Sequence, residues 1–255
     1  MNDEFYIGWE NKAAPGIGRT VRKVVVGLVI LSVLAPIILA VSQRLIGTSV
    51  FEWGTEKSFS GVLQMRPYPH LLVMRPGNLD GQSAFSSYYL AATFKFGLDP
   101  AKISMYDDKP VALKGTLIYR GNQTMIETKP EWIHESTNRP SAQSLPQPIS
   151  LGRQTLVGEI VDSKCFLGVM NPGQLTPHRG CAIRCISGGL PPVLLVRQKD
   201  GPAIYLLLVS SEGKPVNRQV LDMVAEPVQV TGDVDRQGDL LILRADPTTY
   251  RRIQP

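Results

Sequence analysis

The chain has 255 residues, of which 43% are hydrophobic and 19% are charged, and its formal net charge is +5. This balance excludes wholesale disorder, and the length suffices for one large or two small domains. The 27 basic residues are scattered, with no run of four or more Lys or Arg. Because a nucleic-acid-binding surface requires clustered basic residues, we expect no nucleic-acid partner.

An apolar run near the start predicts a membrane span. Residues 24–43 contain no charged side chain, and a helix of this length crosses the roughly 30 Å hydrocarbon core of a bilayer. Four basic residues precede the run: Lys12, Arg19, Arg22 and Lys23. Only Arg44 follows it closely. Since the basic flank of a span stays in the cytoplasm, we predict that residues 1–23 are cytoplasmic and that the chain after about residue 45 is exported.

A cleaved signal peptide is the alternative interpretation of this run. Ala40-Val41-Ser42 has the small-x-small pattern of a cleavage site. However, the 23 residues before the apolar run are long for a signal peptide, and the run itself exceeds the usual hydrophobic region of one. We therefore favour an uncleaved, single-pass helix.

The part of the chain after the span repeats itself at an offset of 117 residues. The aligned pairs are Pro110 with Pro227, Gly115 with Gly232, and Gly121 with Gly238. Both copies alternate apolar and polar residues between glycines, which is typical of strand, turn and strand, and this punctuation favours an OB-type barrel. We predict a mainly β protein in which one N-terminal transmembrane helix is followed by two small OB-like barrels, residues 50–134 and 151–255, with a Pro-rich linker over residues 135–150.

The second copy contains an insertion. From Gly61 to Gly115 is 54 residues, whereas from Gly158 to Gly232 is 74 residues. The 20 additional residues fall near the first strand of the second copy. All three cysteines of the chain and one histidine lie there: Cys165, His178, Cys181 and Cys185.

These four side chains admit three interpretations. Residues 178–187 predict a short helix that ends before Gly188, and seven helical residues rise about 10 Å, so His178 and Cys185 cannot both reach one ion from a straight helix. We favour a disulfide from Cys165 to either Cys181 or Cys185, because an exported protein meets an oxidising compartment. Three thiolates and an imidazole also suit zinc or copper. In the third interpretation the cysteines are simply buried.

Catalytic sequence patterns are missing from the chain. It contains no Gly-rich phosphate loop, no Gly-x-Ser-x-Gly and no His-Glu-x-x-His. We therefore expect a protein that is not an enzyme and that needs no cofactor. Zinc or copper enters only in the metal interpretation of the cysteine cluster.

Two segments of the second copy resemble a group of exported bacterial proteins. The segments are Gly158-Glu159-Ile160-Val161-Asp162-Ser163-Lys164-Cys165 and His178-Arg179-Gly180-Cys181-Ala182-Ile183-Arg184-Cys185-Ile186-Ser187-Gly188-Gly189-Leu190-Pro191-Pro192. They match the signature Asp-x-x-Cys…His-x-x-Cys-Ala-x-x-Cys…Gly-x-Pro, whose carriers tend to occur near electron-transfer components. The resemblance implies a periplasmic location on the bacterial inner membrane and other membrane subunits as partners.

The residues and the resemblance together lead to one functional hypothesis and one alternative. We expect a non-enzymatic, membrane-anchored accessory subunit of a membrane complex, one that handles electrons, with exported barrels that mediate assembly. The alternative is a periplasmic metal- or cofactor-handling protein that uses the Cys/His cluster.

Overall fold

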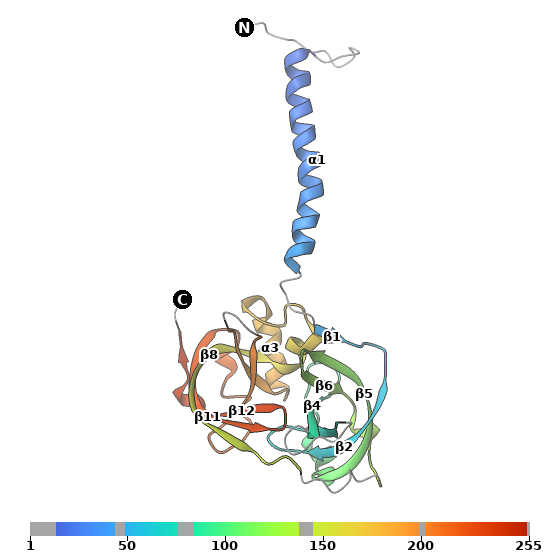
Figure 1. Ribbon diagram of the computed structural model, residues 1–255, viewed down its shortest axis with the longest axis vertical. Helices are drawn as coiled ribbons and strands as arrows, with labels where there is room; N and C mark the ends of the chain where they lie inside the picture. The colour runs from blue at the N-terminus through green and yellow to red at the C-terminus, as the bar shows by residue number, and fades with distance from the viewer. Residues whose placement is uncertain (1–13, 44–48, 76–83, 138–144, 199–201, 254–255) are drawn as a thin grey trace. The chain divides into compact units, whose positions relative to one another are not determined.

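The computed structural model describes residues 14–43, 49–75, 84–137, 145–198 and 202–253 (Figure 1). The chain divides into two compact units, residues 1–47 and residues 48–255. The described part of the first unit is one helix, and all described strands belong to the second unit.

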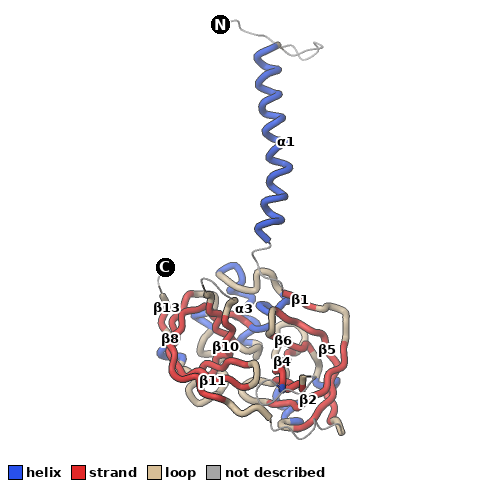
Figure 2. The backbone as a smooth tube through the Cα atoms, viewed as in Figure 1, coloured by secondary structure: helices blue, strands red, loops and turns tan. Residues whose placement is uncertain are grey.

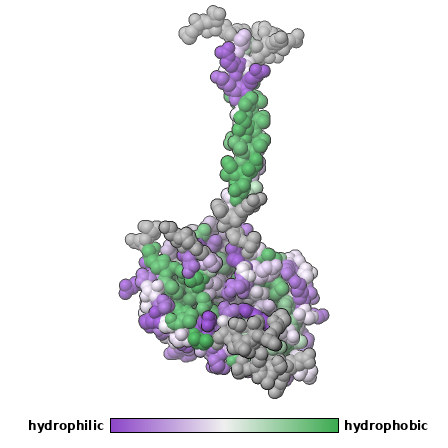
Figure 3. All heavy atoms as spheres, viewed as in Figure 1, coloured by the Kyte–Doolittle hydropathy of each residue, from purple (hydrophilic) through white to green (hydrophobic). Residues whose placement is uncertain are grey.

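Helix α1, Pro15–Gln43, is 29 residues long. It begins at Pro15 rather than at residue 24, because proline suits the first turn of a helix, and it therefore includes most of the basic flank. Its large apolar side chains are exposed on every face, as in Leu31 and Leu39, both 62% exposed, and they form the continuous hydrophobic stretch in Figure 3. By length and composition α1 is able to cross a membrane, as a span or as a signal sequence.

The first barrel is built from seven strands. They are β1 (Ser49–Phe51), β2 (Lys57–Gln64), β3 (His70–Met74), β4 (Phe85–Ala91), β5 (Lys109–Arg120), β6 (Gln123–Glu127) and β7 (Ile133–Glu135), with a short helix α2 (Pro100–Ile103) between β4 and β5. Strand β2 pairs with β3, β3 with β4, β4 in parallel with β6, β6 with β5, and β5 with β2. This closed order is that of an OB barrel.

The second barrel repeats the same circuit. Its strands are β8 (Ile149–Asp162), β9 (Pro192–Val196), β10 (Ile204–Val209), β11 (Pro227–Gln237), β12 (Leu240–Arg244) and β13 (Arg251–Arg252). Strands β8, β9, β10, β12 and β11 close the ring in that order, with β10 and β12 parallel. The prediction of a mainly β fold with two OB-like barrels is therefore confirmed.

Strand register shows how closely the two barrels correspond. Gly61 pairs with Val111 in the first barrel, and Gly158 pairs with Val228 in the second. Val111 also pairs with Glu135, and Val228 with Arg252, so both partners in these pairs are offset by 117 residues. The 117-residue repeat in the sequence is thus a repeat of strand pairing.

At one position of the repeat, close packing of the backbone requires glycine in both barrels. A Cβ on Gly115 would lie 2.6 Å from the Glu127 carbonyl oxygen, and a Cβ on Gly232 would lie 2.3 Å from that of Arg244. Both distances are below van der Waals contact, so only glycine lets β5 cross β6, and β11 cross β12, this closely.

Residues 48–255 form a single unit, in which the two barrels lie side by side (Figure 2) and share a core. One buried cluster contains Tyr89 and Met125 from the first barrel together with Val193 and Leu207 from the second. Strand β7 ends at Glu135 and β8 begins at Ile149. The predicted linker, residues 135–150, covers that whole interval and overlaps the strand ends on both sides, and its residues 138–144 lie outside the described part of the chain.

Candidate functional site

The insertion of the second barrel lies between β8 and β9. It comprises residues 163–191, whereas the equivalent connection between β2 and β3 in the first barrel is residues 65–69. It contains a π-helical turn η4 (Cys165–Val169), a 3₁₀ turn η5 (Thr176–His178) and helix α3 (Arg179–Ser187). The predicted helix from His178 therefore begins one residue later, and His178 closes the preceding 3₁₀ turn.

The insertion packs against the first barrel. A Cβ on Gly168 would lie 2.4 Å from the Val50 carbonyl oxygen, so turn η4 touches β1 with no room for a side chain. Arg120 Nε on β5 donates a hydrogen bond of 2.7 Å to the Phe166 carbonyl oxygen. The Arg120 guanidinium also lies 4.4 Å from the centroid of the Phe166 ring. The cysteine-bearing segment is therefore a contact between the barrels.

The three cysteine sulfurs lie close together and are not bonded to one another. Cys165 Sγ is 3.8 Å from Cys181 Sγ and 3.9 Å from Cys185 Sγ, against about 2.05 Å in a disulfide. All three cysteines are free; Cys165 and Cys185 are buried and Cys181 is half-buried. The two pairings proposed from the sequence are these two close approaches, and a disulfide at either remains a prediction.

Asp162, the last residue of β8, organises the cluster. Its Oδ1 accepts the backbone N–H of Cys165 at 2.8 Å, and its Oδ2 lies 2.9 Å from His178 Nε2. An ionised carboxylate can only accept, so Nε2 carries a hydrogen, and in the neutral form of the ring the lone pair is on Nδ1. Both side chains are buried. Asp162 was not among the predicted ligands, although the Asp-x-x-Cys signature contains it.

The predicted ligands meet as two overlapping groups. Ligand atoms of Cys165, His178 and Cys181 lie within 4.8 Å of one another, and so do those of Asp162, Cys165 and Cys185. Cys165 belongs to both groups. The first group offers two sulfurs and an imidazole nitrogen, the donor types that zinc and copper prefer.

The hydrogen bond between Cys165 and Cys185 shifts the pKa values of these two buried thiols in opposite directions. It is the main cause that raises the pKa of Cys165, with burial second. The same contact lowers the pKa of Cys185. Both shifts therefore come chiefly from one contact between the two sulfurs.

Two lysines complete the site across the barrel junction. Lys95 Nζ, from the connection after β4, lies 2.7 Å from Cys181 Sγ, and this hydrogen bond raises the pKa of Lys95. Lys164 Nζ lies 2.5 Å from Glu127 Oε2 on β6. It also donates to the carbonyl oxygens of Ala92 and Phe94, at 2.7 and 2.8 Å. Sequence reasoning missed both lysines, because their partners are in the other barrel.

Glycines hold the Lys95 connection against the end of α3. Gly97 donates its N–H to the Gly188 carbonyl oxygen at 3.0 Å. A Cβ on Gly188 would lie 2.1 Å from the Lys95 carbonyl oxygen. The two backbones are in direct contact there, and this contact sets the position of Lys95 over Cys181.

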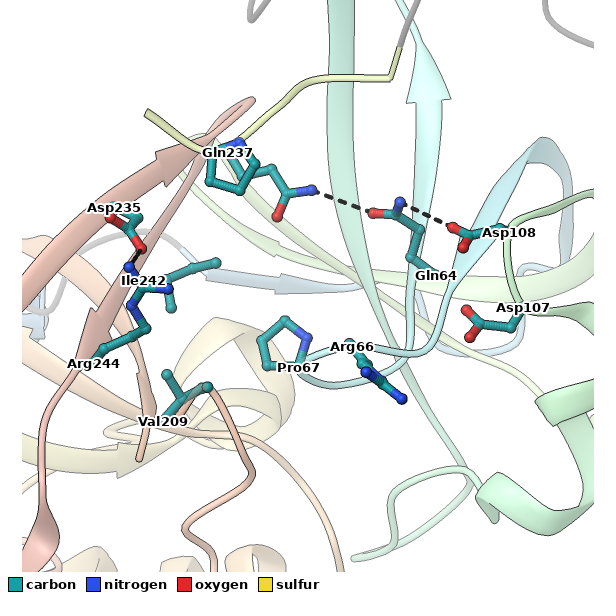
Figure 4. A pocket seen from close by; sticks show the side chains of 12 residues that line it. Gln64, Arg66, Pro67, Asp107, Asp108, Val209, Asp235, Gln237, Ile242 and Arg244 are labelled. Carbon is teal, nitrogen blue, oxygen red and sulfur yellow. Dashed lines mark hydrogen bonds and ion pairs between the residues drawn. The ribbon is translucent and has the colours of Figure 1, made fainter. Parts of the chain in front are cut away.

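A cavity of about 550 Å³ between the barrels lies apart from the cysteines (Figure 4). Five of its polar side chains are paired with one another. Arg244 binds Asp235 at 2.6 Å, and Gln64 Nε2 donates to Asp108 at 3.2 Å. Gln237 Nε2 lies 3.4 Å from Gln64 Oε1. No cysteine or histidine is among the described residues that line this cavity, so the Cys/His cluster is the better candidate for chemistry.

Comparisons with known proteins leave the chain without an assigned family. No family model and no curated protein matches the sequence. Among solved structures, a deletion mutant of the single-stranded DNA binding protein from Thermus aquaticus is similar over 81% of this chain and 96% of its own, at 11% identity and a TM-score of 0.21. A TM-score this low supports no functional argument.

Proposed function

We propose that the chain is a non-enzymatic, membrane-anchored accessory subunit of an electron-transfer complex in the bacterial inner membrane. Helix α1 is the anchor, with the N-terminus in the cytoplasm and the barrels in the periplasm. The observation that carries the proposal is the surface of α1, whose apolar side chains are exposed on all faces over Pro15–Ser42. A helix that is apolar all round requires a bilayer or a protein partner around it.

Exposed aromatic residues on the first barrel support a protein partner. Phe94 is 82% exposed, Trp53 77% and Phe96 58%. Large aromatic residues are enriched at protein–protein interfaces and in their energetic hot spots. Phe94 and Phe96 flank Lys95, so a partner that covers them would also cover the cysteine cluster.

Purification of the native protein in mild detergent tests this role. We expect other membrane subunits to co-purify, and the double variant Phe94→Ser, Phe96→Ser to lose them while its barrels remain folded by circular dichroism. A wild-type chain that purifies as a lone, stable monomer would contradict the role. A reporter fused to the C-terminus tests the orientation separately, and a cytoplasmic signal would contradict it.

A second candidate function is the binding of zinc or copper at the cluster. The specific observation in its favour is the 3.8 Å separation of the Cys165 and Cys181 sulfurs, because two thiolates bound at about 2.3 Å to one tetrahedral ion lie about 3.8 Å apart. Asp162 would act on His178 as carboxylates do on metal-bound imidazoles, by fixing the ring and its tautomer.

Elemental analysis with thiol counting decides this candidate. We expect one metal ion per chain after reduction and exposure to zinc, and loss of that ion in Cys181→Ser. The Cys185→Ser variant should retain the ion, because Cys185 lies outside the Cys165, His178 and Cys181 group. A chain that holds a disulfide and no metal would end this candidate.

A further inference from the structure

We propose that the cluster performs thiol–disulfide exchange, with Cys181 as the attacking thiol, Cys165 as the resolving thiol, and a disulfide-bearing peptide or small molecule as the substrate. The exchange oxidises each chain once and includes no turnover, so it is compatible with the non-enzymatic role proposed above. It rests on the positions of the sulfurs and of Lys95.

Cys181 has the position that an attacking thiol requires. It is half-buried, whereas the other two cysteines are buried, so it is the sulfur that an external disulfide is able to reach. The Lys95 ammonium lies 2.7 Å from its Sγ. A positive charge at this distance stabilises negative charge on sulfur, and the thiolate is the nucleophilic form of cysteine. Cys181 is also the third residue of α3, where the helix dipole acts in the same direction.

Cys165 has the position that a resolving thiol requires. Its Sγ lies 3.8 Å from Cys181 Sγ, so closing the bond needs a movement of about 1.8 Å. It is buried, whereas Cys181 is half-buried, so an external disulfide reaches Cys181 first. The sulfur of Cys185 lies 3.9 Å from Cys165 Sγ and takes no part in either step of the exchange.

The exchange has two balanced steps. In the first, the Cys181 thiolate attacks one sulfur of the substrate R–S–S–R′, a mixed disulfide Cys181–S–S–R forms, and R′S⁻ leaves and takes a proton. In the second, Cys165 loses its proton, attacks Cys181 Sγ, and RS⁻ leaves and takes a proton. Two thiols of the protein are oxidised to one disulfide, and one substrate disulfide is reduced to two thiols.

The first barrel therefore supplies part of a site whose sulfurs all belong to the second. Lys95 reaches Cys181 only because Gly97 and Gly188 allow the two backbones to touch. A disulfide between Cys165 and Cys181 would draw Cys181 Sγ toward Cys165, so exchange at the cluster also changes a contact between the barrels.

The experiment uses the full chain in mild detergent, fully reduced, with a chelator present so that no metal blocks the thiols. Oxidised glutathione is the probe, and acid-quenched samples are mapped by peptide mass spectrometry. We expect wild type to end with a Cys165–Cys181 disulfide and Cys165→Ser to accumulate glutathione on Cys181. The Cys181→Ser variant should not react, and Cys185→Ser, the matched control, should still form the Cys165–Cys181 bond.

Two substitutions test whether the positive charge of Lys95 promotes the reaction of Cys181. Lys95→Gln should slow the reaction of Cys181 with oxidised glutathione by about tenfold, and Lys95→Arg should restore most of the rate. The inference is overturned by any of three outcomes: no glutathione on Cys181 in Cys165→Ser, a Cys185→Ser variant that no longer forms a disulfide, or a Lys95→Gln variant that reacts at the wild-type rate. None of these outcomes bears on whether membrane subunits co-purify.

Discussion

Lys164, in the insertion of the second barrel, buries its ammonium against the Glu127 carboxylate of the first barrel, with Nζ 2.5 Å from Oε2. The Lys164 side chain is 2% exposed and that of Glu127 14%. Two backbone carbonyl oxygens of the first barrel accept its remaining hydrogens. The residue that directly precedes Cys165 is therefore fixed by the neighbouring barrel, and the position of the cysteines depends on that junction.

Removal of one partner of this pair should destabilise the fold strongly. In Glu127→Gln the buried ammonium loses its countercharge, and we expect the free energy of unfolding to fall by about 3–5 kcal/mol. The double variant Glu127→Gln, Lys164→Met should recover much of the loss, because it leaves no charge in the junction. Urea titrations of the full chain measure both, and equal losses in the single and double variants would contradict a buried ion pair.

Substitutions at Gly180, in α3, and at Gly188, just after it, test the backbone contact that positions Lys95. Gly188→Ala should destabilise the protein and lower the reactivity of Cys181, since the new Cβ would lie 2.1 Å from the Lys95 carbonyl oxygen. Gly180→Ala has nothing within 4 Å and should stabilise helix α3 by about 0.5–1 kcal/mol. Thermal unfolding and thiol-reaction rates check the pair; two substitutions with the same effect would refute the close contact.

Because His70 is buried, we predict that the folded protein loses stability in mild acid. Its Nδ1–H donates to the Tyr68 carbonyl oxygen at 2.9 Å, and its Nε2 is buried without a hydrogen-bond partner among the described residues. Burial lowers the pKa of His70, and this outweighs the nearby carboxylates of Asp239, Asp107 and Asp108, which act in the opposite direction.

The sign of the pH effect follows from that lowered pKa. The unfolded chain takes up the proton near pH 6.5 and the folded chain only at lower pH, so the contribution of His70 is present above about pH 6.5 and is lost as the pH falls below it. In His70→Asn, whose amide can donate to the same carbonyl, unfolding free energy should vary less between pH 7 and pH 5. His134→Asn, an exposed control, should keep the wild-type slope.

Asp162→Asn should disturb the metal candidate through His178. An amide that donates its N–H to Nε2 would force the hydrogen onto the other ring nitrogen, which then has no lone pair for a metal. Loss of such a supporting carboxylate typically weakens metal binding by about 10–100-fold. Competition with a chromogenic zinc chelator measures the change, and unaltered affinity would exclude His178 as a ligand.

Sequence patterns were sufficient for the barrels and for the position of the cluster. The repeat of Gly115 at Gly232 marks the same strand crossing in both barrels, and the longer spacing in the second copy locates the insertion. Such signals are local, because alternation and glycine placement report the backbone of one strand pair at a time.

The junction between the barrels could not be predicted in this way. Lys95 and Cys181 are 86 residues apart in the chain, and no pattern in either segment indicates that the two residues are in contact. Alternation of apolar residues tells which face of a strand is buried but not what covers it, so the sequence predicted two barrels but not the core that they share. Tyr68 illustrates this, since its hydroxyl accepts the Val216 N–H of the second barrel at 3.1 Å.

The central claim is that the two barrels fold as one body closed around the cysteine cluster, and a two-probe urea titration of the full chain in mild detergent tests it most directly. Tryptophan fluorescence reports the first barrel through Trp53 and Trp132, because residues 149–253 contain no tryptophan. Mass-spectrometric labelling of the buried thiols Cys165 and Cys185 reports the second. We predict that fluorescence change and thiol labelling have the same midpoint; labelling that is complete before the fluorescence changes would contradict the claim.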